Sequence, residues 1–328
     1  MKRLSALALA ALLILLILTL AACARIPADS QSDVLNPDAN DKISVIATTF
    51  APYDFTREIT GGKAEVAMLL PPASESHSFE PSPQDIVNIQ NCDVFIYVGG
   101  DSDAWVDEVL ESMDTSKMKL ITLMDCVDVV EEEIIPGMEA EEEPEEDEGD
   151  AKPEYDEHVW TSPRNARLIV QKIANTLCEV DSLNAAVYTQ NLIDYSEKLA
   201  ELDGKFQEVV ASAVRKTLVF GDRFPFRYFV DAYGLNYAAA FPGCSTETEP
   251  SAKTVKFLID KINDEQIPVI FHIELSNQKM ANTIAEATGA KVRLLHACHN
   301  VSRDDFKNGE SYLSLMTRNV ETLKEALQ

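Results

Sequence analysis

The chain has 328 residues, with 55 Asp or Glu against 28 Lys or Arg, and therefore carries a formal net charge of −27 at pH 7. Such a charge argues against nucleic acid and anionic lipid as partners and is compatible with cations. The length allows two domains of ~150 residues each.

The N-terminus predicts an export signal. Lys2 and Arg3 precede an apolar run over residues 4–20, and Leu20-Ala21-Ala22-Cys23 follows. A positive start, an apolar stretch and small residues describe a secretory signal, and the cysteine resembles the bacterial lipobox. The alternative is a transmembrane anchor, because the run approaches the ~20 residues that span a bilayer. We expect a signal peptide over 1–22, lipidation of Cys23 and a flexible tether over 23–41.

Residues 42–182 predict an α/β lobe. Short apolar runs at 43–47, 65–70, 94–98 and 119–123 predict strands, and 53–60 and 83–91 predict helices. Ser82 followed by Pro83 is a favourable helix start. Continuous apolar strands that alternate with helices indicate a parallel sheet covered on both faces.

An acidic segment over 131–157 interrupts this pattern. Its Asp, Glu, Pro and Gly residues bury too little apolar surface to fold alone. We expect a mobile loop, either a solvated loop without a specific task or a collector of divalent cations near a site.

A second α/β lobe is predicted over 214–328. Apolar residues at helical spacing over 163–179 and 183–213 predict helices, and the longer one is expected to act as a rigid linker between lobes. Beyond it, the sequence predicts strands at 217–220, 236–241, 268–273 and 291–297, and helices at 224–233, 252–264, 277–288 and 309–327. Two such lobes joined by a helix form a cleft.

Several side chains with metal-binding chemistry follow predicted strands. The chain has five histidines. Ligands of parallel sheets bind beyond the carboxyl ends of the strands, where His77, Asp222, Glu274 and His299 are predicted, and His158 ends the acidic segment. Imidazole with carboxylate suits zinc or manganese.

Structural roles remain open for some of these residues. His272 lies inside a predicted strand, where a histidine is more often a satisfied core residue. His296-Ala-Cys298-His299 fits a chelating corner or a simple strand end, and Asp222-Arg223 fits an ion pair. Six cysteines without CxxC spacing argue against a zinc knuckle or a thioredoxin-like site.

Two motifs resemble those of the zinc/manganese solute-binding lipoproteins of ABC importers. Leu70-Pro-Pro-Ala-Ser-Glu-Ser-His77-Ser-Phe-Glu80-Pro-Ser-Pro83 is similar to their first metal-binding motif. Asp156-Glu-His158-Val-Trp160-Thr-Ser-Pro163 is similar to their second, and Tyr312-Leu-Ser-Leu-Met316 is typical of their C-terminus. The similarity runs from Lys42 to the end of the chain.

The resemblance implies two lobes, a rigid helix and a metal between the lobes. His77 and His158 carry over as ligands. The third position departs from the family, since Arg223 stands where a histidine or glutamate is usual, and arginine cannot ligate a metal. His299 falls close to the fourth position. We therefore expect His77, His158 and His299 as ligands, with Asp222 or Glu274 completing the shell and His296 in reserve.

The implied function is an extracytoplasmic receptor, not an enzyme. It would be a lipid-anchored monomer that delivers Zn²⁺, or less favourably Mn²⁺, to a permease driven by an ATPase. Three histidines favour zinc, and two histidines with two carboxylates favour manganese. The alternatives are an adhesin-like lipoprotein with weak or lost metal binding, suggested by Arg223, and a secreted metallohydrolase, for which no HExxH signature occurs.

Overall fold

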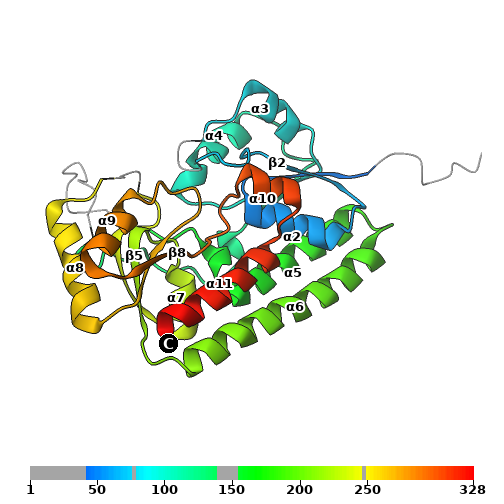
Figure 1. Cartoon of the computed structure of the whole chain (residues 1–328). Coiled ribbons are helices and arrows are strands. Elements are labelled where there is room, and N and C mark those ends of the chain that lie inside the picture. Colours follow the sequence, from blue (N-terminus) through cyan, green and yellow to red (C-terminus); the bar gives the residue numbers. More distant parts are fainter. Residues whose placement is uncertain (1–41, 76–78, 139–153, 246–248) are drawn as a thin grey trace, which may run out of the picture. The chain divides into compact units, whose positions relative to one another are not determined.

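Two parallel four-stranded sheets carry the fold, one from each half of the chain (Figure 1). The computed structural model describes residues 42–75, 79–138, 154–245 and 249–328, and residues 42–328 cluster into one unit. The predicted signal peptide, Cys23, the tether and His77 lie outside the described residues. Within these residues, no helix has both the length and the apolar character to cross a bilayer.

The first sheet has the strand order β2-β1-β3-β4. Its strands are β1 (Ser44–Ala47), β2 (Glu65–Met68), β3 (Val94–Tyr97) and β4 (Lys119–Thr122), and its helical elements are α2 (Phe50–Thr60), α3 (Pro83–Gln90), η1 (Asp101–Asp103), α4 (Ala104–Glu111) and η2 (Met124–Cys126). The expected start of α3 is confirmed, because the Ser82 side chain accepts from the backbone N–H of Asp85, whose carboxylate in turn accepts from Ser82.

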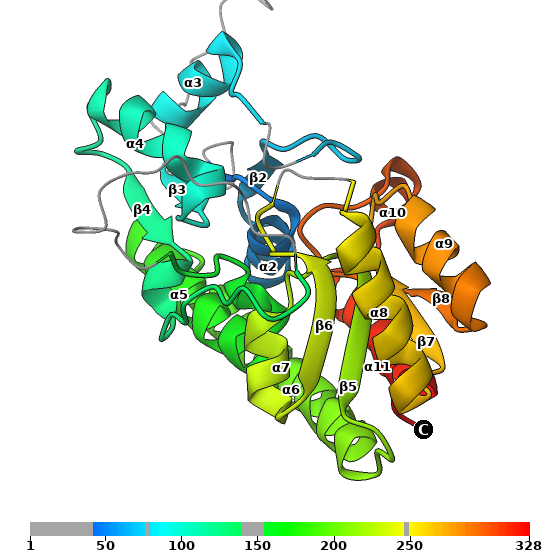
Figure 2. The same ribbon diagram turned by 90° about the vertical axis from the view of Figure 1, so that its left-hand side faces the viewer.

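The second sheet repeats the same order as β6-β5-β7-β8. It contains β5 (Thr217–Arg223), β6 (Asn236–Phe241), β7 (Val269–His272) and β8 (Lys291–Leu294), with helices α7 (Arg227–Tyr233), α8 (Ala252–Glu265), α9 (Lys279–Thr288), α10 (Arg303–Asn308) and α11 (Tyr312–Leu327). In both sheets the order reverses beside the first strand, and the loops at the carboxyl ends of the strands meet at such a point. Figure 2 shows both sheets and the loops between them.

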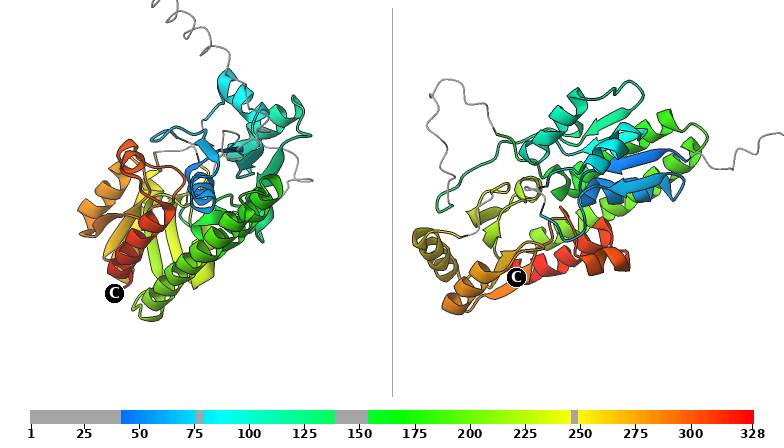
Figure 3. Two further views of the ribbon diagram at one scale, coloured as in Figure 1. Left: turned by 90° about the vertical axis from the view of Figure 1, so that its right-hand side faces the viewer. Right: turned by 90° about the horizontal axis from the view of Figure 1, so that it is seen from above.

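Three helical elements connect the halves: η3 (Val159–Thr161), α5 (Pro163–Val180) and α6 (Ala185–Ala211). The 27 residues of α6 reach ~40 Å at 1.5 Å per residue. The helix packs against α5, α2 and α11 (Figure 3, left). The predicted linker is therefore also part of the packed helical layer.

A single apolar core runs through both halves. Buried side chains from β1, α5, α6, β5 and α11 belong to one cluster. Two smaller clusters fill the outer faces of the sheets, one with α3 and α4, the other with α8 and α9. Each sheet is therefore covered on both faces, as its continuous apolar strands predicted.

Three predicted boundaries near the site were wrong. The strand predicted over 217–220 continues to Arg223, so Asp222 lies inside β5. The strand predicted over 291–297 ends at Leu294, which leaves His296 in the following loop. The helix predicted over 309–327 starts at Tyr312, because Gly309 ends α10 in the left-handed region with φ 74°.

Candidate metal centre

His158 is a buried histidine with a fixed ring. Its exposed fraction is 1 %. Asp156 accepts the backbone N–H of His158 at 2.8 Å through Oδ1, and the same oxygen lies 3.2 Å from the ring Nδ1. A carboxylate on Nδ1 orients the ring and selects the tautomer whose Nε2 carries the lone pair that a metal needs.

The charge around His158 is negative. Burial lowers the pKa of its imidazole, but Asp156, Glu157 and Glu132 outweigh this effect and hold the pKa above its ordinary value. Burial in turn raises the pKa of the Glu157 carboxyl, and His158 and Ser102 oppose that rise. A cation that enters here meets a field that favours positive charge.

His299 is positioned by Glu274. It lies in the loop after β8 and is 9 % exposed. Its backbone N–H donates to Oε1 of Glu274 at 2.9 Å, and the N–H of Ala297 donates to Oε2 at 2.7 Å. The carbonyl of His299 accepts the N–H of Phe50 at 3.1 Å, which ties this loop to the N-terminal half.

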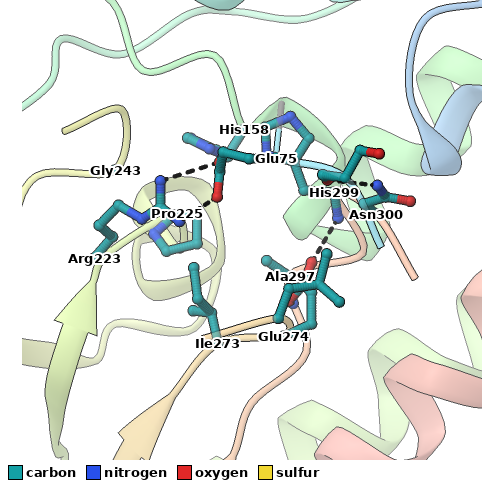
Figure 4. A pocket seen from close by; sticks show the side chains of 12 residues that line it. Glu75, His158, Arg223, Pro225, Gly243, Ile273, Glu274, Ala297, His299 and Asn300 are labelled. Atoms are coloured by element: carbon teal, nitrogen blue, oxygen red, sulfur yellow. Dashed lines mark hydrogen bonds and ion pairs between the residues drawn. The ribbon is translucent and has the colours of Figure 1, made fainter. Parts of the chain in front are cut away.

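The structure brings His158 and His299 together. Their ring centroids are 5.3 Å apart, and Trp160 lies 5.1 Å from the His299 ring. The indole Nε1 of Trp160 donates to the carbonyl of Ala297 at 2.8 Å. Figure 4 shows both histidines at one pocket. His158 comes from the N-terminal half of the chain and His299 from the C-terminal half.

The pocket lies between loops from both sheets. Its lining includes Ser74, Glu75, His158, Arg223, Gly243, Glu274, His299 and Asn300, and its empty space measures about 370 Å³ with the open mouth included. Asn300 donates through Nδ2 to the carbonyls of Pro71 and Ser74 at 2.9 and 2.7 Å. The loop that leads to His77 is thus held against the pocket up to Glu75.

Arg223 occupies the wall of this pocket as an ion-pair partner. Its guanidinium lies 3.1 Å from Oε2 and 3.3 Å from Oε1 of Glu75, so the pair joins β5 to the loop after β2 (Figure 4). The Arg223 side chain is 17 % exposed. The sequence allows an ion pair of Asp222 with Arg223, but the hydrogen bonds of the Arg223 guanidinium go to Glu75 and to the carbonyl of Ser245.

Asp222 and His296 have their donor atoms turned to the backbone. Asp222 accepts the N–H of Arg223 at 2.9 Å and of Ile273 at 3.3 Å, and burial raises the pKa of its carboxyl. Nδ1 of His296 accepts the N–H of Cys298 at 3.0 Å. Both residues shape the loops beneath the pocket.

Cys244 is the residue that the sequence did not reveal. Its sulfur, a ring nitrogen of His158 and a carboxylate oxygen of Glu157 lie within 4.8 Å of one another. Cys244 follows Gly243, where a Cβ would lie 3.0 Å from Cε1 of His158, so the backbone here packs directly on the ring. Burial raises the pKa of the Cys244 thiol well above its ordinary value, and nearby carboxylates add to this rise.

The described ends of the acidic segment contact the same loop. Glu131 and Tyr155 form an antiparallel bridge, and Oε1 of Glu132 accepts the N–H of Gly243 at 2.7 Å. Tyr228 donates its hydroxyl to the carbonyl of Asp156 at 2.6 Å. Residues 139–153 of this segment lie outside the described part of the chain.

Comparison with known proteins gives a consistent picture. The family model described as "Zinc-uptake complex component A periplasmic" matches residues 45–326. The zinc-binding lipoprotein AdcA of Streptococcus pneumoniae is 32% identical over 289 residues, which cover 88% of this chain and 56% of AdcA, so the chain spans about half the length of that relative. The high-affinity zinc uptake system protein ZnuA of Bacillus subtilis is 30% identical over 94% of both chains.

Solved structures agree with the fold. The Zn(II)-bound ZnuA-like domain of AdcA from Streptococcus pneumoniae superposes with a TM-score of 0.72 at 29% identity, covering 88% of this chain and 99% of that domain. The metal-dependent lipoprotein YcdH of Bacillus subtilis gives a TM-score of 0.74 at 28% identity, covering 88% of this chain and all of that structure, 100%. The expected pair of parallel-sheet lobes is confirmed.

Proposed function

The chain belongs to the family of zinc-uptake complex component A, and from that membership we propose that it is the metal-capturing receptor of an ABC importer. It binds Zn²⁺ between its two halves and delivers the ion to a permease driven by an ATPase.

One observation carries the proposal. His158 and His299 come from opposite halves of the chain, are both at least nine-tenths buried and lie with ring centroids 5.3 Å apart. Asp156 holds the ring of His158, and Glu274 holds the backbone of His299. Two imidazoles positioned in this way in a negatively charged pocket form the core of a divalent-metal site. His77 remains a predicted third ligand from its motif.

Zinc is the favoured cargo. Imidazole ligands suit zinc, whereas oxygen ligands suit manganese. The carboxylates nearest to the histidines serve protein contacts: Glu274 accepts backbone N–H groups of the His299 loop, and Glu157 accepts the N–H and hydroxyl of Ser102. The two imidazoles supply nitrogen donors, and these favour zinc.

The protein acts as a receptor and not as an enzyme. A catalytic zinc keeps an open position for water and a nearby general base. Here the Glu274 carboxylate is held by two backbone N–H groups at 2.7 and 2.9 Å, an arrangement that orients a loop and leaves the carboxylate poorly placed to move protons. Lipidation at Cys23 would keep such a receptor beside its permease, on the outer side of the membrane. The receptor would act as a monomer.

Calorimetry on the purified, chelator-stripped protein tests this function. Zn²⁺ is expected to bind at one site with a Kd below micromolar and tighter than Mn²⁺. His158→Ala and His299→Ala should each weaken zinc binding by at least about 100-fold. Absence of submicromolar binding of either ion to the unaltered protein would refute the receptor.

Intrinsic fluorescence supplies an independent readout. The chain has two tryptophans, and Trp160 lies 5.1 Å from the His299 ring. Trp105→Phe leaves Trp160 as the reporter, so zinc should change its emission with the same midpoint as in the calorimetric titration. His272→Ala is the control for the two histidine variants and should bind zinc as the unaltered protein does. Nδ1 of His272 contacts the carbonyl of Ile273 and does not face the pocket.

A further inference from the structure

We infer that the thiolate of Cys244 is a metal ligand of this chain, supplying from the loop after β6 the donor that Arg223 cannot supply from β5. This inference rests on the proposed function, since it assigns a ligand to the same site.

The position of Arg223 creates the need for another donor. A guanidinium is always protonated and offers no lone pair to a metal. Arg223 is also committed to Glu75, at 3.1 and 3.3 Å, across the mouth of the pocket. A second donor from the C-terminal half, beside His299, must therefore come from a different residue.

The other predicted donors of that half are engaged in holding the backbone. Both oxygens of Asp222 and both of Glu274 accept backbone N–H groups. His296 accepts the N–H of Cys298 through Nδ1, which places its proton on Nε2 and removes the lone pair that would bind a metal.

Cys244 is already close to the buried histidine. Its sulfur and a ring nitrogen of His158 belong to a group of ligand atoms within 4.8 Å of one another. The neighbouring Gly243 has no side chain, and its backbone packs on the His158 ring at a position where a Cβ would lie 3.0 Å from Cε1. Two ligand atoms of one zinc ion, each ~2.0–2.3 Å from it, lie within such a distance of each other, so the observed spacing fits a shared ion.

The loop that carries Cys244 is held from the N-terminal half. Oε1 of Glu132 accepts the N–H of Gly243 at 2.7 Å. Glu157, the third member of the group, accepts the N–H of Ser102 at 3.1 Å and a hydroxyl hydrogen bond from the same residue. Glu157 is thus held in place, and Cys244 and His158 remain as the pair that binds the ion.

Thiolate ligation also has a consequence for selectivity. Sulfur is a soft donor that favours zinc over manganese. The thiol gives its proton to solvent as the metal–sulfur bond forms, and no oxidation takes place. A thiolate beside imidazoles therefore strengthens zinc binding more than manganese binding in a site where the usual histidine or glutamate is missing.

Cobalt substitution tests the inference. Co²⁺ added to the purified, metal-stripped full-length protein should produce the near-ultraviolet charge-transfer band that only thiolate ligation gives. Cys244→Ser should abolish this band, and Cys126→Ser, a cysteine whose sulfur contacts the carbonyl of Thr122, should leave it unchanged. Cys244→His should bind zinc and cobalt without the band.

Affinity completes the test. Cys244→Ser should weaken zinc binding by ~100-fold or more while it leaves manganese binding within a few-fold, so the preference for zinc shrinks. If the unaltered protein binds Co²⁺ without the band, or if Cys244→Ser retains it, the ligand assignment is overturned and the receptor stands. If the unaltered protein binds neither zinc nor cobalt, the proposed function itself fails.

Discussion

At the scale of single residues, position at the end of a segment brought some of the predicted residues to the pocket and not others. His158 and His299 were predicted from their positions at the ends of segments together with the family resemblance, and the structure places both at one pocket. Asp222 and His296 have equally suitable chemistry, but they turn toward backbone groups that only the folded loops bring near. Cys244 has no spacing signature, and its proximity to His158 arises from two chain segments that no local pattern relates.

Glu274 provides a residue-scale prediction. Glu274→Gln keeps the size of the side chain but offers one acceptor oxygen to two backbone N–H groups, those of Ala297 and His299. One N–H then loses its partner, which costs about 1–3 kcal/mol. The loop that carries His299 loosens, and zinc affinity should fall by ~10–100-fold, as for other partners that orient ligands.

Titration calorimetry and X-ray absorption together check this role. The number and type of atoms bound to zinc should be the same in Glu274→Gln and in the unaltered protein, because Glu274 orients a ligand. Glu286→Gln, on the exposed side of α9, is the control and should bind zinc normally. Loss of an oxygen neighbour of zinc in the Glu274 variant would make Glu274 a ligand instead.

At the scale of elements, apolar runs predicted which segments are strands, and loops decided where the strands end. β6 has the predicted bounds, whereas β5 extends three residues further, through an irregularity in its pairing with β6 between Phe220 and Arg223. Gly221 allows this extension, because a Cβ there would lie 2.7 Å from Cα of Ala281 on α9. The spacing of apolar residues along the sequence cannot predict this close approach of α9 to β5.

A contact between two helices has a pH-dependent energy. The carboxylate of Asp54 on α2 accepts the N–H of Tyr312, the first residue of α11, at 2.8 Å. Burial raises the pKa of this carboxyl from 3.8 to about 6. Between those values the folded protein binds more protons than the unfolded chain, so the free energy of unfolding falls as the pH rises.

Asp54→Asn should remove this part of the pH dependence. The shift in pKa corresponds to about 3 kcal/mol, lost between about pH 4 and pH 6 in the unaltered protein. The amide oxygen of asparagine can still accept the N–H of Tyr312 and carries no charge at any pH. Urea unfolding of the metal-free protein should therefore show a shallower decline in the variant across this range.

The exposed Asp260 on α8 supplies the control for this measurement, since Asp260→Asn should keep the decline of the unaltered protein. Asp103, whose pKa burial also raises to about 6, leaves some decline in every variant. An Asp54→Asn profile parallel to that of the unaltered protein would contradict the assignment of this energy to Asp54.

At the scale of the whole molecule, the shared core limits how the two halves move. Side chains of α5, α6 and α11 belong to the same buried cluster as both sheets. A wide hinge motion would open this core, and each buried apolar side chain exposed costs about 1.5–3 kcal/mol. Metal release is therefore expected through movements of loops and ligands at the pocket.

Crystal structures with and without zinc test this expectation. The two sheets should keep their relative orientation, and differences should concentrate in the loops after β6 and β8. A rotation of one half against the other by tens of degrees would show that the shared core does not restrain the motion. Small-angle scattering in both states would detect the same rotation in solution.

The contact between Asp54 and Tyr312 also bears on the order in which the molecule can form. The two residues are 258 positions apart, and α11 lies beside α6 and belongs to the cluster shared by both halves (Figure 1). A chain that emerges from the ribosome cannot complete this central cluster until α11 has been made. The segments that precede α11 therefore stay short of their final packing until that helix is available.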